Sequence, residues 1–150
     1  MRKSFVTKIL PASILCTALI SGCDNKVSEG TCAVDTVNGV LAGEVTKVKK
    51  PAILPVSGWA FDDRSRSVPA EVSIELLSSD GKVSVTGAAA RGTKRPDVAK
   101  VYGNEEYIAA GFDGAVNVEK APLGRYSMWI IQKSGATQLS CNSTRFVELQ

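Results

Sequence analysis

The 150-residue chain contains no histidine and few aromatic residues: two tryptophans, three tyrosines and four phenylalanines. Without histidine it lacks the commonest general base in catalysis and the usual nitrogen ligand of zinc. Asp62 with Asp63 is a pair of adjacent carboxylates, but neighbours on a strand point to opposite faces and do not form one acid–base pair. A serine with a lysine base is the remaining catalytic alternative, and no catalytic or phosphate-binding motif is present. We therefore predict a protein that is not an enzyme and binds no cofactor or metal.

A hydrophobic run long enough to span a bilayer is also missing. The most apolar stretch, residues 9–20, is shorter than the roughly 20 residues that a transmembrane helix needs, and it contains Pro11. Arg2, Lys3 and Lys8 precede it, which is the charge pattern of a secretory signal. We therefore predict a cleaved signal helix in residues 1–22.

The residues that end this signal are Ile20, Ser21, Gly22 and Cys23, followed by Asp24. They resemble the lipobox of bacterial lipoproteins, whereas ordinary signal peptidase favours a small residue where Ile20 stands. The resemblance implies a diacylglycerol on the Cys23 sulfur and a palmitate-type chain on its amine. Asp24 resembles the inner-membrane retention signal of enteric bacteria, which implies a lipid-anchored protein facing the periplasm. A plain secreted or uncleaved product is the alternative.

The chain has four cysteines, and their predicted fates differ. Cys16 leaves with the signal and Cys23 carries lipid, so Cys32 and Cys141 remain. An even pair in an oxidising compartment predicts a disulfide, with two free buried thiols as the alternative. Closing so long a loop would stabilise the fold by roughly 4 to 5 kcal/mol.

The net charge changes meaning once the signal is removed. The whole chain is formally +3, with 18 basic and 15 acidic residues, and the signal takes three of the basic ones. The mature protein is therefore formally neutral and has no field that would draw it onto a polyanion. We predict no nucleic-acid partner, and we predict membrane attachment through the lipid on Cys23.

Residues 23–31 are polar and predict a short tether, which leaves residues 32–150 as one domain. Apolar residues alternate with polar ones at residues 72–76 and 83–86, separated by the turn residues 79–81, which predicts a β-hairpin. Further strands are predicted at 37–48, 53–61, 116–119, 125–132, 138–141 and 145–149. About seven short strands favour an all-β domain, either a sandwich or a barrel, and we predict an immunoglobulin-like β-sandwich.

One segment departs from the strand pattern. Pro96 and Asp97 suit the first turn of a helix, Val98 and Val101 share a face at helical spacing, and Gly103 can end it. This predicts a short helical insertion that packs across one end of the sandwich.

Four short motifs carry a resemblance to a known protein module through their order and spacing. They are Gly58-Trp59-Ala60-Phe61-Asp62, Arg95-Pro96-Asp97-Val98-Ala99, Gly111-Phe112 and Leu123-Gly124-Arg125-Tyr126. Over residues 53–133 the chain resembles a small β-sandwich module of bacterial envelope proteins, found attached to membrane glycosyltransferases and surface-polysaccharide proteins and in some free-standing lipoproteins. The resemblance carries no known ligand or catalytic residue. The lipobox implies a self-standing version of the module.

The candidate ligand-contacting residues are aromatic or basic. Trp59 and Trp129 could stack on sugars, but large aromatic residues in strands usually fill interiors, so we predict that both pack in the core. Tyr102 and Tyr107, near the insertion, are candidates for exposed binding residues.

Arg95 is the candidate basic contact. It belongs to a cluster that could meet an anionic glycan or an acidic partner, or could be a solvated surface in which Arg95 pairs with Asp97 or Asp113. The other members of the cluster are Arg91, Lys94 and Lys100.

Together these features predict a membrane-anchored envelope lipoprotein that acts as a non-catalytic binding or scaffolding module for an envelope glycan or protein. The alternative is an immunity or inhibitor lipoprotein that blocks a toxin or hydrolase in the envelope. Such proteins are also small, disulfide-bonded and lipidated.

Overall fold

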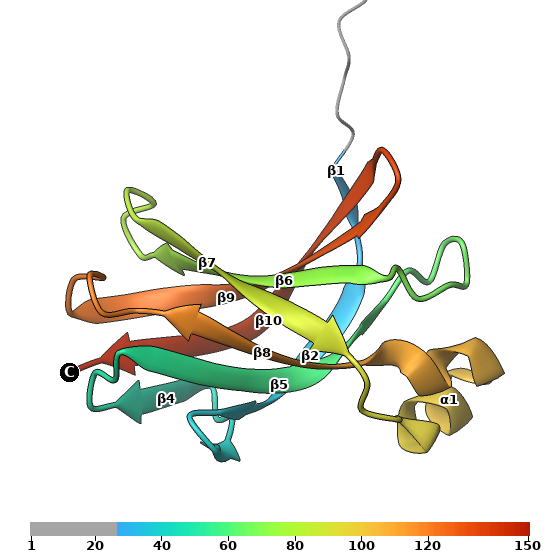
Figure 1. The fold of residues 1–150 in the computed structure, drawn as a ribbon, viewed down its shortest axis with the longest axis horizontal. Helices are drawn as coiled ribbons and strands as arrows, with labels where there is room; N and C mark the ends of the chain where they lie inside the picture. The colour runs from blue at the N-terminus through green and yellow to red at the C-terminus, as the bar shows by residue number, and fades with distance from the viewer. Residues whose placement is uncertain (1–26) are drawn as a thin grey trace, which may run out of the picture.

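A computed structural model describes residues 27–150, and it is almost entirely β (Figure 1). The strands are β1 (Val27–Glu29), β2 (Thr31–Val37), β3 (Val40–Leu41), β4 (Val45–Val48), β5 (Ile53–Phe61), β6 (Glu71–Ser78), β7 (Ser84–Arg91), β8 (Gly111–Asn117), β9 (Gly124–Ser134) and β10 (Thr137–Leu149). A helix, α1 (Pro96–Tyr102), and a 3-10 helix, η1 (Glu105–Ala110), lie between β7 and β8. The predicted all-β sandwich with one short helical insertion is confirmed.

The number of strands exceeds the prediction because of three short strands and of β2, a seven-residue strand that was not predicted. β8 spans Gly111–Asn117 where a strand was predicted at 116–119, so that prediction is correct only for the end of the strand. Ten strands occur in residues 27–150 against about seven predicted, but β1, β3 and β4 have only three, two and four residues. The stretch 37–48, predicted as one strand, is divided by a turn in which Asn38 and Gly39 both have positive φ. The strands predicted at 138–141 and 145–149 are one strand, β10, interrupted by an irregularity in register between Asn142 and Phe146.

The strands form one continuous hydrogen-bonded path that folds into two layers. The order is β1-β10-β9-β6-β7-β8-β5-β2-β3, and β4 also pairs with β10. β7 belongs to both layers, because most of it pairs with β6 while its last residues, Ala89 to Arg91, pair with β8. It therefore runs obliquely across the molecule (Figure 1). Gly87 allows this crossing, since a Cβ there would collide with the Ala115 carbonyl.

The second junction between the layers lies at the chain's first strands. β1 and β4 each pair with β10 in parallel, whereas β2, which directly follows β1, pairs with β5 of the other layer. The first residues of the domain therefore join both layers. Parallel pairing was not predicted, because alternation in a sequence says which face a residue occupies but not which strand lies beside it.

The hydrophobic core lies between the two layers and follows from period-two alternation. On β5, for example, Leu54, Val56 and Ala60 are buried in it while Ile53 is half exposed. The predicted hairpin of β6 and β7 is present, with Gly81 at positive φ in its turn. The largest residues of this core are Leu54, Ile74, Leu76, Phe112, Tyr126, Met128, Ile130 and Leu149.

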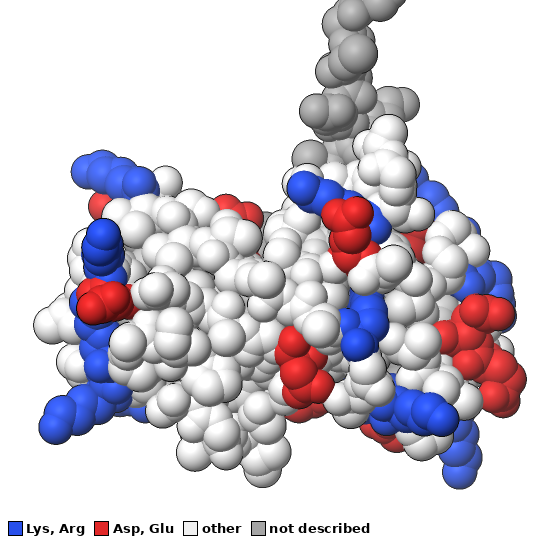
Figure 2. Space-filling view, viewed as in Figure 1, with Lys and Arg blue, Asp and Glu red and all other residues white. Residues whose placement is uncertain are grey.

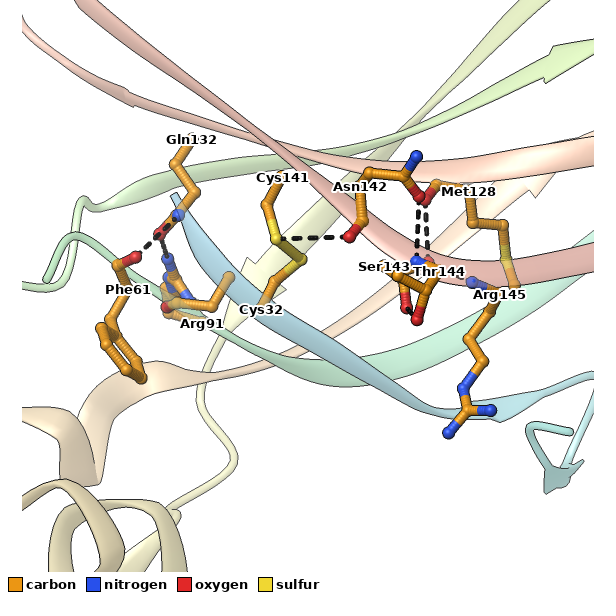
Figure 3. The surroundings of a disulfide bond; sticks show 11 residues. Cys32, Phe61, Arg91, Met128, Gln132, Cys141, Asn142, Ser143, Thr144 and Arg145 are labelled. Atoms are coloured by element: carbon orange, nitrogen blue, oxygen red, sulfur yellow. Dashed lines mark hydrogen bonds between the residues drawn. A yellow bond between two sulfur atoms is a disulfide. The ribbon is translucent and has the colours of Figure 1, made fainter. Parts of the chain in front are cut away.

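A disulfide joins Cys32 of β2 to Cys141 of β10, so the predicted pairing is confirmed (Figure 3). The two Cα atoms are 6.1 Å apart across a sequence separation of 109 residues. Because β2 and β10 belong to different layers, the bond covalently links the two halves of the sandwich. This constrains the unfolded chain strongly, since the closed loop is long.

The predicted signal, Cys23 and Asp24 lie outside residues 27–150. Within the segment predicted as a tether, Val27–Glu29 form β1 and Thr31 belongs to β2, so the sheet includes residues up to five positions before Cys32. Within residues 27–150, none of the helices has the length and apolar character needed to cross a bilayer.

Candidate binding surface

The helical insertion begins and ends where its sequence indicates. Pro96 occupies the first turn of α1 and Asp97 is acidic at the same end, while Gly103 ends the helix in the left-handed conformation with its N–H donating to the Ala99 carbonyl. The side chain of Asn104 then accepts a hydrogen bond from the Glu106 N–H and starts η1. Figure 1 places α1 at the end of the molecule away from the C-terminus.

The insertion covers a second, smaller core on the outer face of β5. Ala60 points into the main core, so its neighbour Phe61 points outward, and Phe61 is fully buried there. The residues that surround it come mainly from the insertion: Val98, Ala99, Tyr107 and Ala110, with Trp59, Val68 and Ile108 packed at the edge.

Four aromatic rings meet in this second core. Phe61 stacks on Tyr107 with ring centroids 3.9 Å apart and on Trp59 at 5.5 Å, and the edge of Tyr102 approaches Phe61 at 4.8 Å. Such offset and edge contacts stabilise aromatic pairs beyond the area they bury. Tyr102 is nevertheless 41% exposed and its neighbour Val101 is 78% exposed. We call Trp59, Val101 and Tyr102 the insertion patch.

Tyr102 and Tyr107, both predicted as exposed candidates, have different environments. Tyr102 is a surface residue, as predicted. Tyr107 is only 1% exposed, so the prediction for it is wrong: its ring fills the space above Phe61. Burial raises the pKa of Tyr107, and its hydroxyl donates to Asp63 at 3.3 Å. Tyr107 therefore supports the insertion patch from beneath.

Arg95 fixes the start of α1 to the sheet. Its Nη1 contacts Asp35 at 2.5 Å and its Nη2 contacts Asp97 at 2.6 Å, with 17% of the side chain exposed. A Cβ on Gly111 of β8 would touch the Arg95 side chain, and Asp35 belongs to β2, so Arg95 crosses over β5 between them. Hydrogen bonding to Asp97 raises the pKa of Arg95 and lowers that of Asp97 to about 2.

The predicted basic cluster is therefore not a single charged surface. The pairing of Arg95 with Asp97 is confirmed, whereas Asp113 accepts a hydrogen bond from the Thr93 hydroxyl instead. Lys94 and Lys100 are exposed. On the face shown in Figure 2, acidic and basic side chains alternate around the end that carries α1. Because both carboxylates hold Arg95, it acts in positioning α1 rather than as a free cation for a ligand.

Arg91 was predicted as a member of the basic cluster, and that prediction is also wrong, because its guanidinium is used within the fold. Its guanidinium donates to the carbonyls of Pro69, Ala60 and Ala110 and to the side chain of Gln132 at 2.6 to 3.1 Å. Gln132 is fully buried and donates in turn to the Phe61 carbonyl at 3.2 Å (Figure 3). Burial lowers the pKa of Arg91 to about 10. It lies at the same alternation as the inward residues Gly87 and Ala89 of β7, and that signal could have identified it.

The two tryptophans occupy the outer faces of opposite layers. Met128 and Ile130 point into the main core, so Trp129 points outward and is half-buried on β9. The prediction that both tryptophans fill the interior is wrong for Trp129. Trp59 is only partly buried, because it packs at the edge of the second core. Each indole therefore leaves part of its surface to solvent.

No group of three or more potential metal-ligating side chains occurs in residues 27–150. Asp62 accepts hydrogen bonds from Arg64 and Ser65 in a tight turn and thus stabilises that turn. The geometry at the insertion supports contact by aromatic and aliphatic surfaces.

No protein-family model, curated protein or solved structure matches this chain.

Proposed function

We propose that this protein is a lipid-anchored envelope lipoprotein that acts as a non-catalytic binding or scaffolding module. The lipid on Cys23 holds it to the cell membrane with the domain facing the periplasm, and Asp24 favours the inner membrane. The neutral charge balance after Cys23 and the disulfide between Cys32 and Cys141 support an exported protein that does not act on polyanions.

The observation that carries the binding role is the insertion patch. Val101 and Tyr102 expose apolar surface, and Phe61 and Tyr107 support Tyr102 from beneath. A rigid aromatic anchor beside an exposed aliphatic side chain is typical of the centre of a protein–protein interface, and charged neighbours are typical of its rim. The patch therefore favours an envelope protein as the partner, and a glycan is the other outcome of the test.

The patch is tested by photo-crosslinking in cells with a reactive residue at position 101. The matched control is position 123, because Leu123 is also an exposed apolar residue, at 64%, but lies on the β8–β9 connection. We expect an adduct at 101 and none at 123, and we expect Tyr102→Ala to remove it. An adduct that glycan hydrolases digest would identify a glycan, and one with an envelope hydrolase that loses activity would support the inhibitor function. Equal labelling at both positions would reject the patch.

The anchor is tested separately by fatty-acid labelling. Cys23→Ser should abolish incorporation, whereas Cys16→Ser, a cysteine within the predicted signal, should leave it unchanged. Unchanged labelling of the Cys23→Ser protein would reject the lipobox.

A further inference from the structure

A hollow of about 420 Å³ opens on the outer face of the other layer, beside the disulfide. It is lined by Glu29, Gly30, Trp129, Ser140, Cys141 and Asn142. These residues come from β1, the residue after it, β9 and β10, which lie side by side in the sheet. The volume lies within the range of about 300 to 1,000 Å³ that small-molecule sites occupy.

Trp129 forms the flat apolar wall of this hollow. Its indole N–H donates to the Ser127 hydroxyl at 3.1 Å, two residues earlier on the same strand. That bond satisfies the only polar atom of the ring and aligns the indole along β9. What Trp129 offers to a ligand is therefore its ring face, held in one orientation before anything binds.

Asn142 is oriented by an unusual piece of backbone. The register of β10 against β9 shifts after Asn142, and Thr144 has φ of +58°, which is rare for a β-branched residue. The Asn142 Oδ1 accepts the Thr144 N–H at 2.9 Å, and Ser143 donates to the Met128 carbonyl at 2.8 Å (Figure 3). With its oxygen used in this way, Asn142, which lines the hollow together with Trp129, keeps its amide NH₂ as the group that can donate to a ligand.

The chemistry of the lining identifies one class of ligand. An indole face suits the C–H face of a pyranose ring, while the amide of Asn142, the hydroxyl of Ser140 and the carboxylate of Glu29 can bind ring hydroxyls. Among residues 27–150, the lining includes one carboxylate and no lysine or arginine. Charge complementarity therefore favours a neutral sugar or an amino sugar over an anionic glycan.

We propose that this hollow is a saccharide-binding site in which a pyranose ring stacks on Trp129 and its hydroxyls bind Asn142, Ser140 and Glu29. The site is distinct from the insertion patch, and the proposal requires neither that patch nor the lipid anchor. It assigns the module a glycan ligand in addition to its protein partner.

The chain's two tryptophans make the test direct, because Trp59→Phe leaves Trp129 as the only indole. The purified lipoprotein, in a detergent without a sugar headgroup, is titrated with tetramers of N-acetylglucosamine, of β-linked glucose and of α-linked glucose. We expect a saturable change in Trp129 emission with at least one tetramer. By calorimetry, Trp129→Ala and Asn142→Ala should each weaken binding about tenfold or more, and Leu123→Ala, at an exposed residue of the β8–β9 connection, should leave it unchanged.

Glu29→Gln is the conservative variant, because Glu29 is exposed and substitutions at exposed positions usually change stability little. It should weaken binding of any tetramer that the wild-type protein binds, while the circular dichroism spectrum stays the same as that of the wild type. Absence of binding by all three tetramers would overturn the proposal, as would affinities unchanged by Trp129→Ala and Asn142→Ala. Loss of binding on Trp59→Ala alone would move the sugar to the insertion patch and overturn this site, while the proposed function would stand.

Discussion

The two outer faces of the sandwich each carry a tryptophan, but the rest of the chain covers only one of these faces. On the layer of β5, Trp59 lies at the edge of an aromatic cluster that the helical insertion covers. On the layer of β9, Trp129 stays beside an open hollow. The same residue type on equivalent faces thus supports a second core in one case and leaves a concave site in the other.

The difference arises from the connections between strands. β7 and β8 are joined by α1 and η1, which fold back over the outer face of β5. β9 and β10 are joined by a tight turn with Gly135 at positive φ. A turn of that length cannot reach back over Trp129. Loop length, rather than the composition of the strands, therefore decides which face remains available to a ligand.

The largest effect is expected from cutting the link between the two layers. Replacing both cysteines, Cys32→Ser with Cys141→Ser, should lower the free energy of unfolding by about 4 to 5 kcal/mol, because a closed loop of over a hundred residues is released in the unfolded state. Urea unfolding of the oxidised protein and of the variant measures the difference. Equal midpoints would contradict the role of the bond, and the wild type under reducing conditions is the control.

The next effect separates the covered face from the open one. Phe61→Ala should cost about 3 to 5 kcal/mol, because Phe61 is fully buried and contacts three other rings. Trp129→Ala should cost less, since the half-buried indole has solvent on one side. The same urea experiment compares the two variants. A larger loss for Trp129→Ala would show that the open face contributes more to stability than its contacts indicate.

A smaller effect is expected at Arg91. Arg91→Lys keeps the charge, but a lysine ammonium cannot reach all four acceptors. Buried carbonyls then lose their hydrogen-bond partners, which should lower the free energy of unfolding by about 1 to 3 kcal/mol. The matched control is Lys94→Ala, an exposed change three residues later, between β7 and α1, that should stay within about 0.5 kcal/mol. Thermal unfolding at neutral pH compares the two. Similar midpoints for both variants would show that the guanidinium bonds add no stability.

The smallest effect concerns the pH dependence of the ion pair that fixes α1. The pKa of Asp97 is about 2 in the folded protein, below its ordinary value of 3.8, because Arg95 donates hydrogen bonds to it. A lowered folded-state pKa contributes stability that is present above pH 3.8 and is lost as the pH falls toward 2. Asp97→Asn should remove this part of the acid dependence. Thermal midpoints of both proteins between these pH values test it, and parallel curves would contradict it.

Much of the fold could be predicted from the sequence because its signals are local. Alternation located five of the seven longer strands and the end of β8, but it missed β2. Pro96 and Gly103 bounded the helix, and the cysteine count indicated the bond between Cys32 and Cys141. The candidate site was harder to predict. Tyr102 was recognised as a surface residue, but Tyr107 was not recognised as a buried one, because its burial depends on Phe61, which is distant in sequence.

The amino-acid sequence by itself determined the strand periodicity, the helix ends, the disulfide partners and the absence of histidine chemistry, since each depends on residue type and short spacing. Only the tertiary structure decided which way Trp129 points. β9 is apolar on both faces, so its pattern cannot say which face is inward, and the packing of the second layer decides it. For Arg91, alternation along β7 indicates an inward side chain, but only the tertiary structure brings together its four acceptors, which come from separate segments.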